Sequence, residues 1–152
     1  MSTPPSSNPH FDRLQHMPLF GGLNEAALTV LLAHSHEVQR SADALFFSEG
    51  ERGDSLYVLN MGEVMLTKNS DTGPVTLTRL APGDCFGEMA VIDFSPRSAT
   101  ARAVTESSAL EVSMDGLLAL YRSDVEQFAL IQMNMARELS RRLRKLGDRL
   151  RG

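Results

Sequence analysis

The chain has 152 residues, of which 42% are hydrophobic and 22% charged, and it carries a net charge of −4. This length suits one domain of roughly 100–150 residues and leaves no room for a second. The single cysteine, Cys85, excludes an internal disulfide, a four-cysteine zinc site and a cysteine-ligated iron–sulfur cluster, and no apolar run reaches the ~18 residues needed to span a bilayer. We therefore expect a soluble, cytoplasmic domain that does not enter a membrane.

The N-terminal third of the chain begins with a polar tail and a helix. Residues 1–10 are rich in Pro and Ser and predict a disordered tail, so the folded domain should cover residues 11–152. Leu28, Leu31 and Leu32 follow at helical spacing, and Asn24 stands where an N-cap is expected. We predict a helix over residues 23–34.

Short β-rich runs separated by turn residues occupy residues 37–114. The runs predicted as strands are 44–47, 55–59, 63–67, 75–79, 100–104 and 109–112, and the turns between them are rich in Gly, Pro, Asn and Asp. Many short strands with evenly spaced turns favour a barrel or a rolled sandwich.

Two helices should follow the strands. Asp115 is the expected cap of a short helix through Tyr121, and Ser123 or Asp124 the cap of a long helix through about Leu150. Along that helix the leucines at 139, 143, 146 and 150 are spaced by 4, 3 and 4 residues, which predicts one apolar stripe. The stripe favours pairing with a second helix, in a homodimer or with another protein. The alternative is that it packs on its own domain.

Charge is distributed unevenly along the chain. Residues 137–152 hold seven of the 15 basic residues but two of the 19 acidic ones, a net +5, which leaves −9 for residues 1–136. A duplex-binding protein usually has a dominant basic face, so the body of the chain has the wrong sign for that role. The basic end could contact nucleic acid or an acidic partner, or it could be a solvated helix face.

The segment from residue 83 to residue 101 carries the chemistry. Gly87 and Glu88 precede a short apolar run, Met89–Phe94, which predicts a helix of one or two turns that ends before Pro96. The free N–H groups at the start of such a helix favour an anion, and the guanidinium of Arg97 could bind a phosphate. Glu88 could accept from ribose hydroxyls. These residues together predict a pocket for a compact phosphate ester of ribose, whereas the alternative is a surface ion pair between Glu88 and Arg97.

The residues 86–90, Phe-Gly-Glu-Met-Ala, and 96–100, Pro-Arg-Ser-Ala-Thr, resemble the phosphate-binding cassette of cyclic nucleotide-binding domains. The segments 49–64 and 80–84 resemble the turns and strands that lead into that cassette. The resemblance implies an α+β fold: an antiparallel β-roll, or jelly roll, with N-terminal helices, a short cassette helix and a long C-terminal helix.

The resemblance also implies roles for individual residues. Glu88 would bind the ribose 2′-hydroxyl, Arg97 the cyclic phosphate, and Met89 would cover the sugar. The residues that would line the phosphate are Gly87, Ala90, Ser98 and Ala99, and those that would flank the base are Val64, Leu77 and Thr78. Some relatives place a Thr-Ser pair of the long helix over the base, but this chain has Arg142 and Leu143 there, so packing by Leu143 or Leu146, or stacking by Arg142, would cap the purine. The expected ligand is cyclic AMP, with cyclic GMP as the alternative, and no metal or cofactor is expected.

These patterns favour a binding module over an enzyme. The four histidines lie outside the cassette, and no nucleophile-elbow or P-loop pattern is present. The expected function is a cyclic nucleotide receptor that signals by moving its C-terminal helix. One alternative is the sensor domain of a larger transcription regulator or channel, and another is a structural β-roll that binds no nucleotide. Since the sequence ends at Gly152 without the helix-turn-helix that family transcription factors carry, we expect no sequence-specific DNA binding by this chain.

Overall fold

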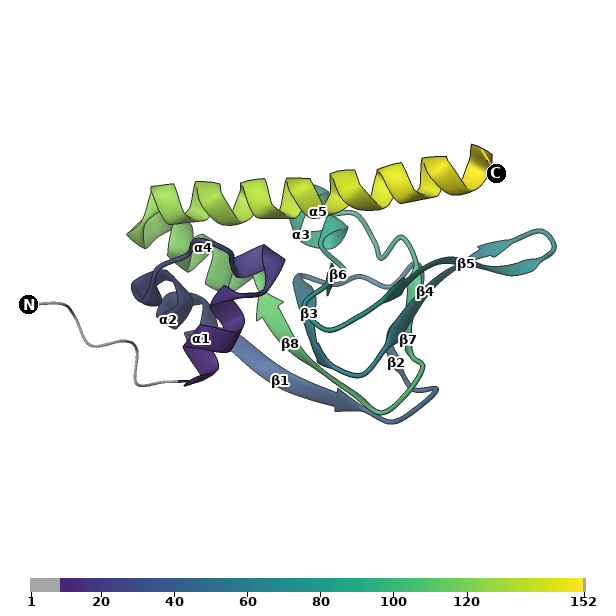
Figure 1. Cartoon of the computed structure of the whole chain (residues 1–152), viewed down its shortest axis with the longest axis horizontal. Helices are drawn as coiled ribbons and strands as arrows, with labels where there is room; N and C mark the ends of the chain where they lie inside the picture. Colours follow the sequence, from purple (N-terminus) through teal and green to yellow (C-terminus); the bar gives the residue numbers. More distant parts are fainter. Residues whose placement is uncertain (1–8, 152) are drawn as a thin grey trace, which may run out of the picture.

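The computed structural model describes residues 9–151, which form a β-roll with helices packed at one end and along one side (Figure 1). In chain order its elements are α1 (Pro9–Gln15), the 3-10 helix η1 (Pro18–Phe20), α2 (Glu25–Ala33), β1 (Ser35–Arg40), β2 (Leu45–Phe47), β3 (Ser55–Met61), β4 (Val64–Ser70), β5 (Gly73–Leu80), β6 (Cys85–Phe86), α3 (Met89–Asp93), β7 (Thr100–Ala103), β8 (Ser107–Ser113), α4 (Met114–Ser123) and α5 (Val125–Arg151).

The strands form two four-stranded sheets, in the orders β1-β8-β3-β6 and β2-β7-β4-β5. Every pairing between neighbouring strands is antiparallel. Inside the roll, the Phe46 and Phe86 rings meet edge to face at 5.3 Å, and Tyr57 stacks on Phe86 at 5.2 Å between centroids. This architecture confirms the predicted α+β fold with an antiparallel β-roll.

The first half of α5 is fixed to the helical end of the molecule. Ile131 and Met135 are fully buried in the cluster that η1, α2 and α4 share. The side chain of Asn134 donates to the carbonyl oxygens of Leu19 (2.9 Å) and Gly21 (3.0 Å), which satisfies backbone groups next to η1. From there α5 runs across α3 and on toward β5 (Figure 1). The second half of α5 therefore lies over the cassette.

Most predicted elements occur, with differences at their edges. Asn24 caps α2 as predicted, since its Oδ1 accepts from the Ala27 N–H at 2.8 Å. The cap of α4 is Ser113 rather than Asp115, because the Ser113 hydroxyl accepts from the Gly116 N–H at 3.2 Å. Helix α1 begins at Pro9, inside the segment predicted as a tail, and residues 1–8 of that tail lie outside the described residues. Strands β1 and β6 were not predicted.

The four leucines of α5 do not share one environment, which corrects the predicted single stripe. Leu139 and Leu146 are partly buried and face the β-roll, where they line a cavity. Leu143 borders the same cavity but is 71% exposed, and Leu150 is 90% exposed. A helix turns by about 100° per residue, so residues spaced by 4, 3 and 4 form a narrow arc around the helix. This arc crosses the boundary between the side that packs on the roll and the side that faces solvent.

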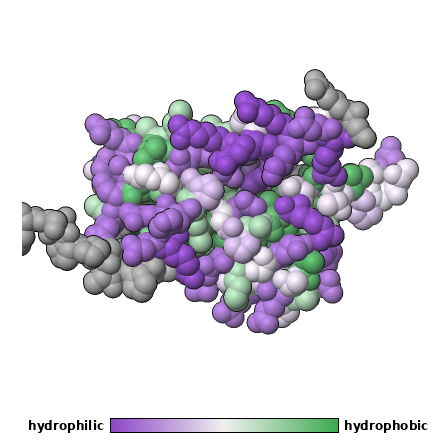
Figure 2. All heavy atoms as spheres, viewed as in Figure 1, coloured by the Kyte–Doolittle hydropathy of each residue, from purple (hydrophilic) through white to green (hydrophobic). Residues whose placement is uncertain are grey.

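The surface over α5 is mainly hydrophilic, with hydrophobic residues visible between α5 and the roll (Figure 2). Within residues 9–151, no helix combines the length and the apolar character needed to cross a membrane.

Candidate functional site

The guanidinium of Arg97 lies inside the β-roll, and the residue is only 5% exposed. Its Nη1 donates to the carbonyl oxygens of Ser55 (2.7 Å) and Gly87 (3.0 Å), and its Nη2 to the Ser55 hydroxyl (3.4 Å). The guanidinium carbon lies 4.3 Å from the centroid of the Phe47 ring, a cation–π distance. Strands β2 and β3 and the cassette loop thus hold this cation in one orientation.

Two glycines make room for the guanidinium. A Cβ at Gly53 would lie 2.6 Å from Cζ of Arg97, and one at Gly87 would lie 2.7 Å from Nη1. Gly87 also has φ +79°, a conformation that side-chain-bearing residues rarely adopt. Any larger residue at either position would push against the guanidinium.

Among the described residues, Arg97 is a buried cation without an acidic partner within ion-pair distance. None of the four ion pairs among the described residues involves it. Burial lowers the pKa of Arg97 from its ordinary value, against the opposing effect of Tyr57 and of the acids Glu111, Asp54 and Glu51. Within residues 9–151, no hydrogen bond engages its Nε, although a guanidinium has five N–H donors. An unpaired buried cation is costly, so the site favours an anion next to Arg97.

The second buried charge of the site, Glu88, stands at the start of α3 and is 3% exposed. Its carbonyl oxygen accepts from the N–H groups of Val91 (3.1 Å) and Ile92 (3.0 Å), which closes the first turn. Its carboxylate does not cap that helix. Instead Oε1 of Glu88 accepts from Nη1 of Arg142 on α5 at 2.9 Å, and Nη2 of Arg142 donates to the Cys85 carbonyl. The predicted alternative, an ion pair between Glu88 and Arg97, is therefore not what the structure contains.

Both charges face one open cavity of about 150 Å³ between the cassette, the roll and α5. Its lining includes all seven cassette residues that were predicted: Gly87, Glu88, Met89, Ala90, Arg97, Ser98 and Ala99. It also includes five of the residues expected around a base: Leu77, Thr78, Arg142, Leu143 and Leu146. Val64 is not among the lining residues. Its side chain is fully buried in the core of the roll, two residues before the lining residue Leu66 on the same strand.

Sequence reasoning missed several parts of this site. Phe47 and Leu66 line the cavity from β2 and β4, and Leu139 joins them from α5. Ser55, whose carbonyl oxygen accepts from Arg97, is the first residue of β3. Gly53, which leaves room for the guanidinium, lies in the loop before β3. Of these missed residues, Gly53 alone had a signal in the sequence, and that signal indicates only a turn residue. The structure shows no positive φ there, so its role is clearance for Arg97.

Cys85 lies beside the cavity but is fully buried. Burial, together with the nearby Glu88 carboxylate, raises the pKa of the Cys85 thiol to about 12. A buried thiol with a raised pKa gives no support to a nucleophilic role. Among residues 9–151, no cluster of three or more His, Cys, Asp or Glu could hold a metal ion.

The buried thiol should be unreactive in the folded protein. At pH 8 a thiol of pKa about 12 is ionised in only about one molecule in 10⁴, and the thiolate is the reactive species. We expect iodoacetamide to leave Cys85 unmodified in the native chain and to alkylate it fully in guanidinium chloride, as measured by mass spectrometry. Complete native alkylation within minutes at pH 8 would contradict the burial described above.

Comparisons with known proteins agree with this arrangement. The family model described as "Cyclic nucleotide-binding domain" matches residues 37–124. A CRP-like cAMP-activated global transcriptional regulator of Mycobacterium tuberculosis is 32% identical over 87% of this chain and 58% of its own length. The chain thus spans somewhat more than half the length of that relative.

Two solved structures are similar over most of the chain. The cyclic nucleotide-binding domain from Methylobacillus flagellatus superposes with a TM-score of 0.85 at 25% identity, over 93% of this chain and 82% of its own. The catabolite activator protein of Thermus thermophilus has a TM-score of 0.73 at 34% identity, over 88% of this chain and 61% of its own. The cassette, the roll and the family match all lead to one conclusion: the chain belongs to the cyclic nucleotide-binding domain family.

Proposed function

We propose that this chain is a receptor for cyclic AMP. The observation that carries the proposal is Arg97, a buried guanidinium that has no acidic partner within ion-pair distance among the described residues and lines an open cavity. A cyclic phosphate has a single negative charge and would supply the missing partner. Glu88, on the same cavity wall, would accept from the ribose 2′-hydroxyl, and the apolar lining of β4, β5 and α5 would surround the purine.

The choice of cyclic AMP over cyclic GMP is supported by what the M. tuberculosis relative is named for, activation by cAMP. Isothermal titration with both nucleotides tests the proposal. We expect binding with a Kd in the micromolar range or tighter, and tighter for cyclic AMP than for cyclic GMP. The absence of heat and of any change in Tm with either nucleotide at millimolar concentration would favour the alternative, a structural β-roll that binds no nucleotide.

We also propose that α5 transmits the binding event. The first half of α5 is held by Asn134 and by buried apolar residues, whereas the second half contributes four residues to the cavity wall. A ligand in the cavity would therefore contact the second half directly and favour one of its placements over others. This role is the same for a receptor that acts alone and for the sensor part of a larger regulator or channel.

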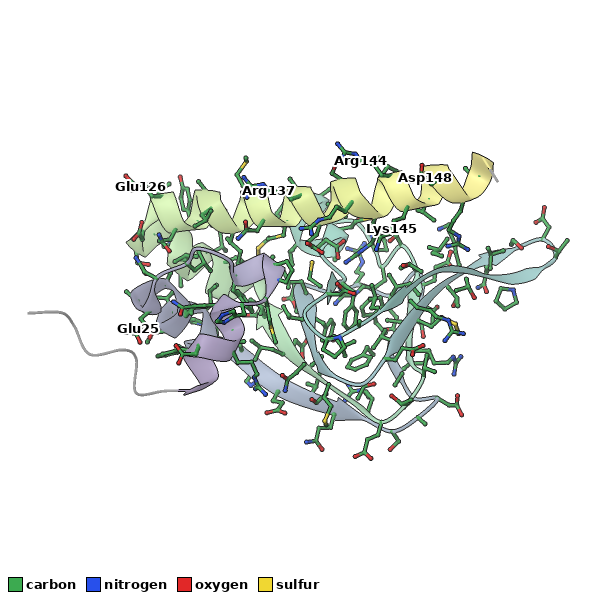
Figure 3. The ribbon with its side chains drawn as sticks, in the orientation of Figure 1. Glu25, Glu126, Arg137, Arg144, Lys145 and Asp148 are labelled. Carbon is green, nitrogen blue, oxygen red and sulfur yellow. The ribbon has the colours of Figure 1, made fainter. Side chains whose placement is uncertain are left out.

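A second candidate interaction is the pairing of two copies through α5. The exposed side of the helix repeats at intervals of 4 and 3 residues, a heptad pattern made of Ala129, Met133, Ala136, Ser140, Leu143, Gly147 and Leu150. Small residues at several of these positions would allow two helices to approach closely. Arg144 lies on the solvent side of α5, whereas Lys145 points toward the roll (Figure 3). Pairing would bring the Arg137 and Arg144 side chains of two copies near each other, so we expect a weak dimer.

Replacing Met133 with glutamate should disrupt this pairing, because it places a charge in the middle of the exposed face. We expect sedimentation velocity at about 100 μM to show dimer for the unmodified chain and monomer for Met133→Glu. The matched control is Met61→Glu on β3, since Met61 and Met133 are 55% and 53% exposed. A monomer for the unmodified chain at this concentration, both with and without cyclic AMP, would rule out the dimer.

A further inference from the structure

The carboxylate that would bind the ribose is already occupied by a side chain of the same protein. The ion pair between Arg142 and Glu88 is short, at 2.9 Å, and its side chains are 17% and 3% exposed. In each of the other three ion pairs among residues 9–151, at least one side chain is more than half exposed. The second contact, from Arg142 Nη2 to the Cys85 carbonyl, fixes the guanidinium between β6 and the start of α3.

We infer that Arg142 competes with the ribose 2′-hydroxyl of a bound nucleotide for the Glu88 carboxylate. The inference rests on the proposed function, because it takes Glu88 as the ribose ligand. Oε1 of Glu88 accepts from Nη1 of Arg142, and a hydroxyl that takes the place of this donor breaks a charge-assisted hydrogen bond. Arg142 therefore lowers the affinity for the nucleotide and acts on it through Glu88.

The position of Arg142 on α5 gives the competition a structural consequence. Asn134 and Met135 hold the helix two turns earlier. Beyond Arg142, the polar contacts of α5 with the roll that the described part of the chain contains are those from Arg149 to the carbonyl oxygens of Leu77 and Thr76. Both of these last contacts are exposed, and exposed contacts contribute little. Release of Arg142 would thus remove the part-buried polar contacts that join the second half of α5 to β6 and the cassette. The ligand and the helix compete for the same carboxylate.

The discriminating experiment compares two ligands on two variants. 2′-Deoxy cyclic AMP has no hydroxyl for Glu88 and can bind with the Arg142–Glu88 pair intact. Arg142→Met keeps an unbranched apolar stem and removes the donors. We therefore expect it to raise the affinity for cyclic AMP about 5- to 30-fold and to change the affinity for the deoxy ligand by less than about twofold. Arg142→Lys keeps the charge but not the two-point contact, and should fall between.

Two controls separate competition from a general effect on the fold. Arg141→Met changes the neighbouring residue, whose guanidinium pairs with Glu138 instead, and should leave both affinities unchanged. In a Glu88→Gln background the gain from Arg142→Met should shrink to less than about twofold, because the charge that Arg142 blocks is gone. Circular dichroism and Tm of each variant report whether it folds, and the lysine variant carries the test if the methionine variant does not.

The outcomes are distinct. A gain for cyclic AMP alone, lost in the Glu88→Gln background, supports the competition. A loss of cyclic AMP affinity in Arg142→Met would mean that Arg142 contacts the ligand. An equal change for both ligands would mean that Arg142 has a structural role. Either result overturns the inference and leaves the proposed receptor function in place. No binding of either ligand by the unmodified chain and by all variants would overturn the proposed function itself.

Discussion

Replacing Arg97 with alanine should lower the affinity for cyclic AMP about 30- to 1000-fold, equivalent to roughly 2–4 kcal/mol. The variant would leave the phosphate in a partly enclosed site without its cation. Stability should change less than affinity, since two effects oppose each other. The Ser55 and Gly87 carbonyl groups lose their donor, which destabilises the fold, but a buried cation without an ion-pair partner is removed at the same time.

Isothermal titration and thermal unfolding of the same samples separate these two quantities. Arg102→Ala is the matched control, because Arg102 lies on the neighbouring strand β7 and its guanidinium donates to the Asp43 carbonyl at an exposed position. This control should bind as the unmodified chain does. A loss of less than threefold for Arg97→Ala would mean that Arg97 is not the phosphate ligand.

Replacing Gly53 with alanine should lower the affinity about 10- to 100-fold although Gly53 is not expected to touch the nucleotide. The added Cβ would lie 2.6 Å from the guanidinium carbon of Arg97, which is too close for any real contact. Arg97 is held against the Phe47 ring and two carbonyl groups, so it can yield only by leaving this cradle. The phosphate would then lose an oriented donor, which is the main advantage of an arginine over a diffuse charge.

Gly50→Ala in the same loop is the control for this effect. Gly50 has φ +88°, so alanine there introduces backbone strain, but its Cβ would have no neighbour within 4 Å. We expect Gly50→Ala to lower Tm and to keep the affinity within about twofold, and Gly53→Ala to do the reverse. Similar losses of affinity in both variants would attribute the effect to the loop as a whole and contradict the clearance role of Gly53.

The cassette could be predicted from the sequence because it is local. A glycine, the carboxylate, a short helix, a proline and the arginine follow one another within residues 87–97, so their order alone places them on one surface. The cradle of Arg97 could not be predicted in this way. Phe47, Gly53 and Ser55 reach the guanidinium through the pairing of strands that are far apart in sequence, and nothing in their own segments indicates a cation.

The missed strands have a similar explanation. Strand β1 has the sequence Ser-His-Glu-Val-Gln-Arg, in which Val38 is the one apolar residue and none is fully buried, so it lacks the alternation that indicates a half-buried strand. Strand β6 has two residues and exists because Cys85 and Phe86 pair with Val58 and Tyr57. The ion pair between Glu88 and Arg142 could not be predicted either, because the pattern of residues along a helix does not tell whether Arg142 faces the cassette.

The most direct measurement of the central claim is a crystal structure of the chain with cyclic AMP bound. We expect the cyclic phosphate to accept hydrogen bonds from Arg97 and the ribose 2′-hydroxyl to donate to Glu88. We also expect that Arg142 no longer contacts that carboxylate. A nucleotide whose phosphate lies away from Arg97, for example along the basic side chains of Lys145 and Arg149, with Arg97 still bonded only to Ser55 and Gly87, would contradict it.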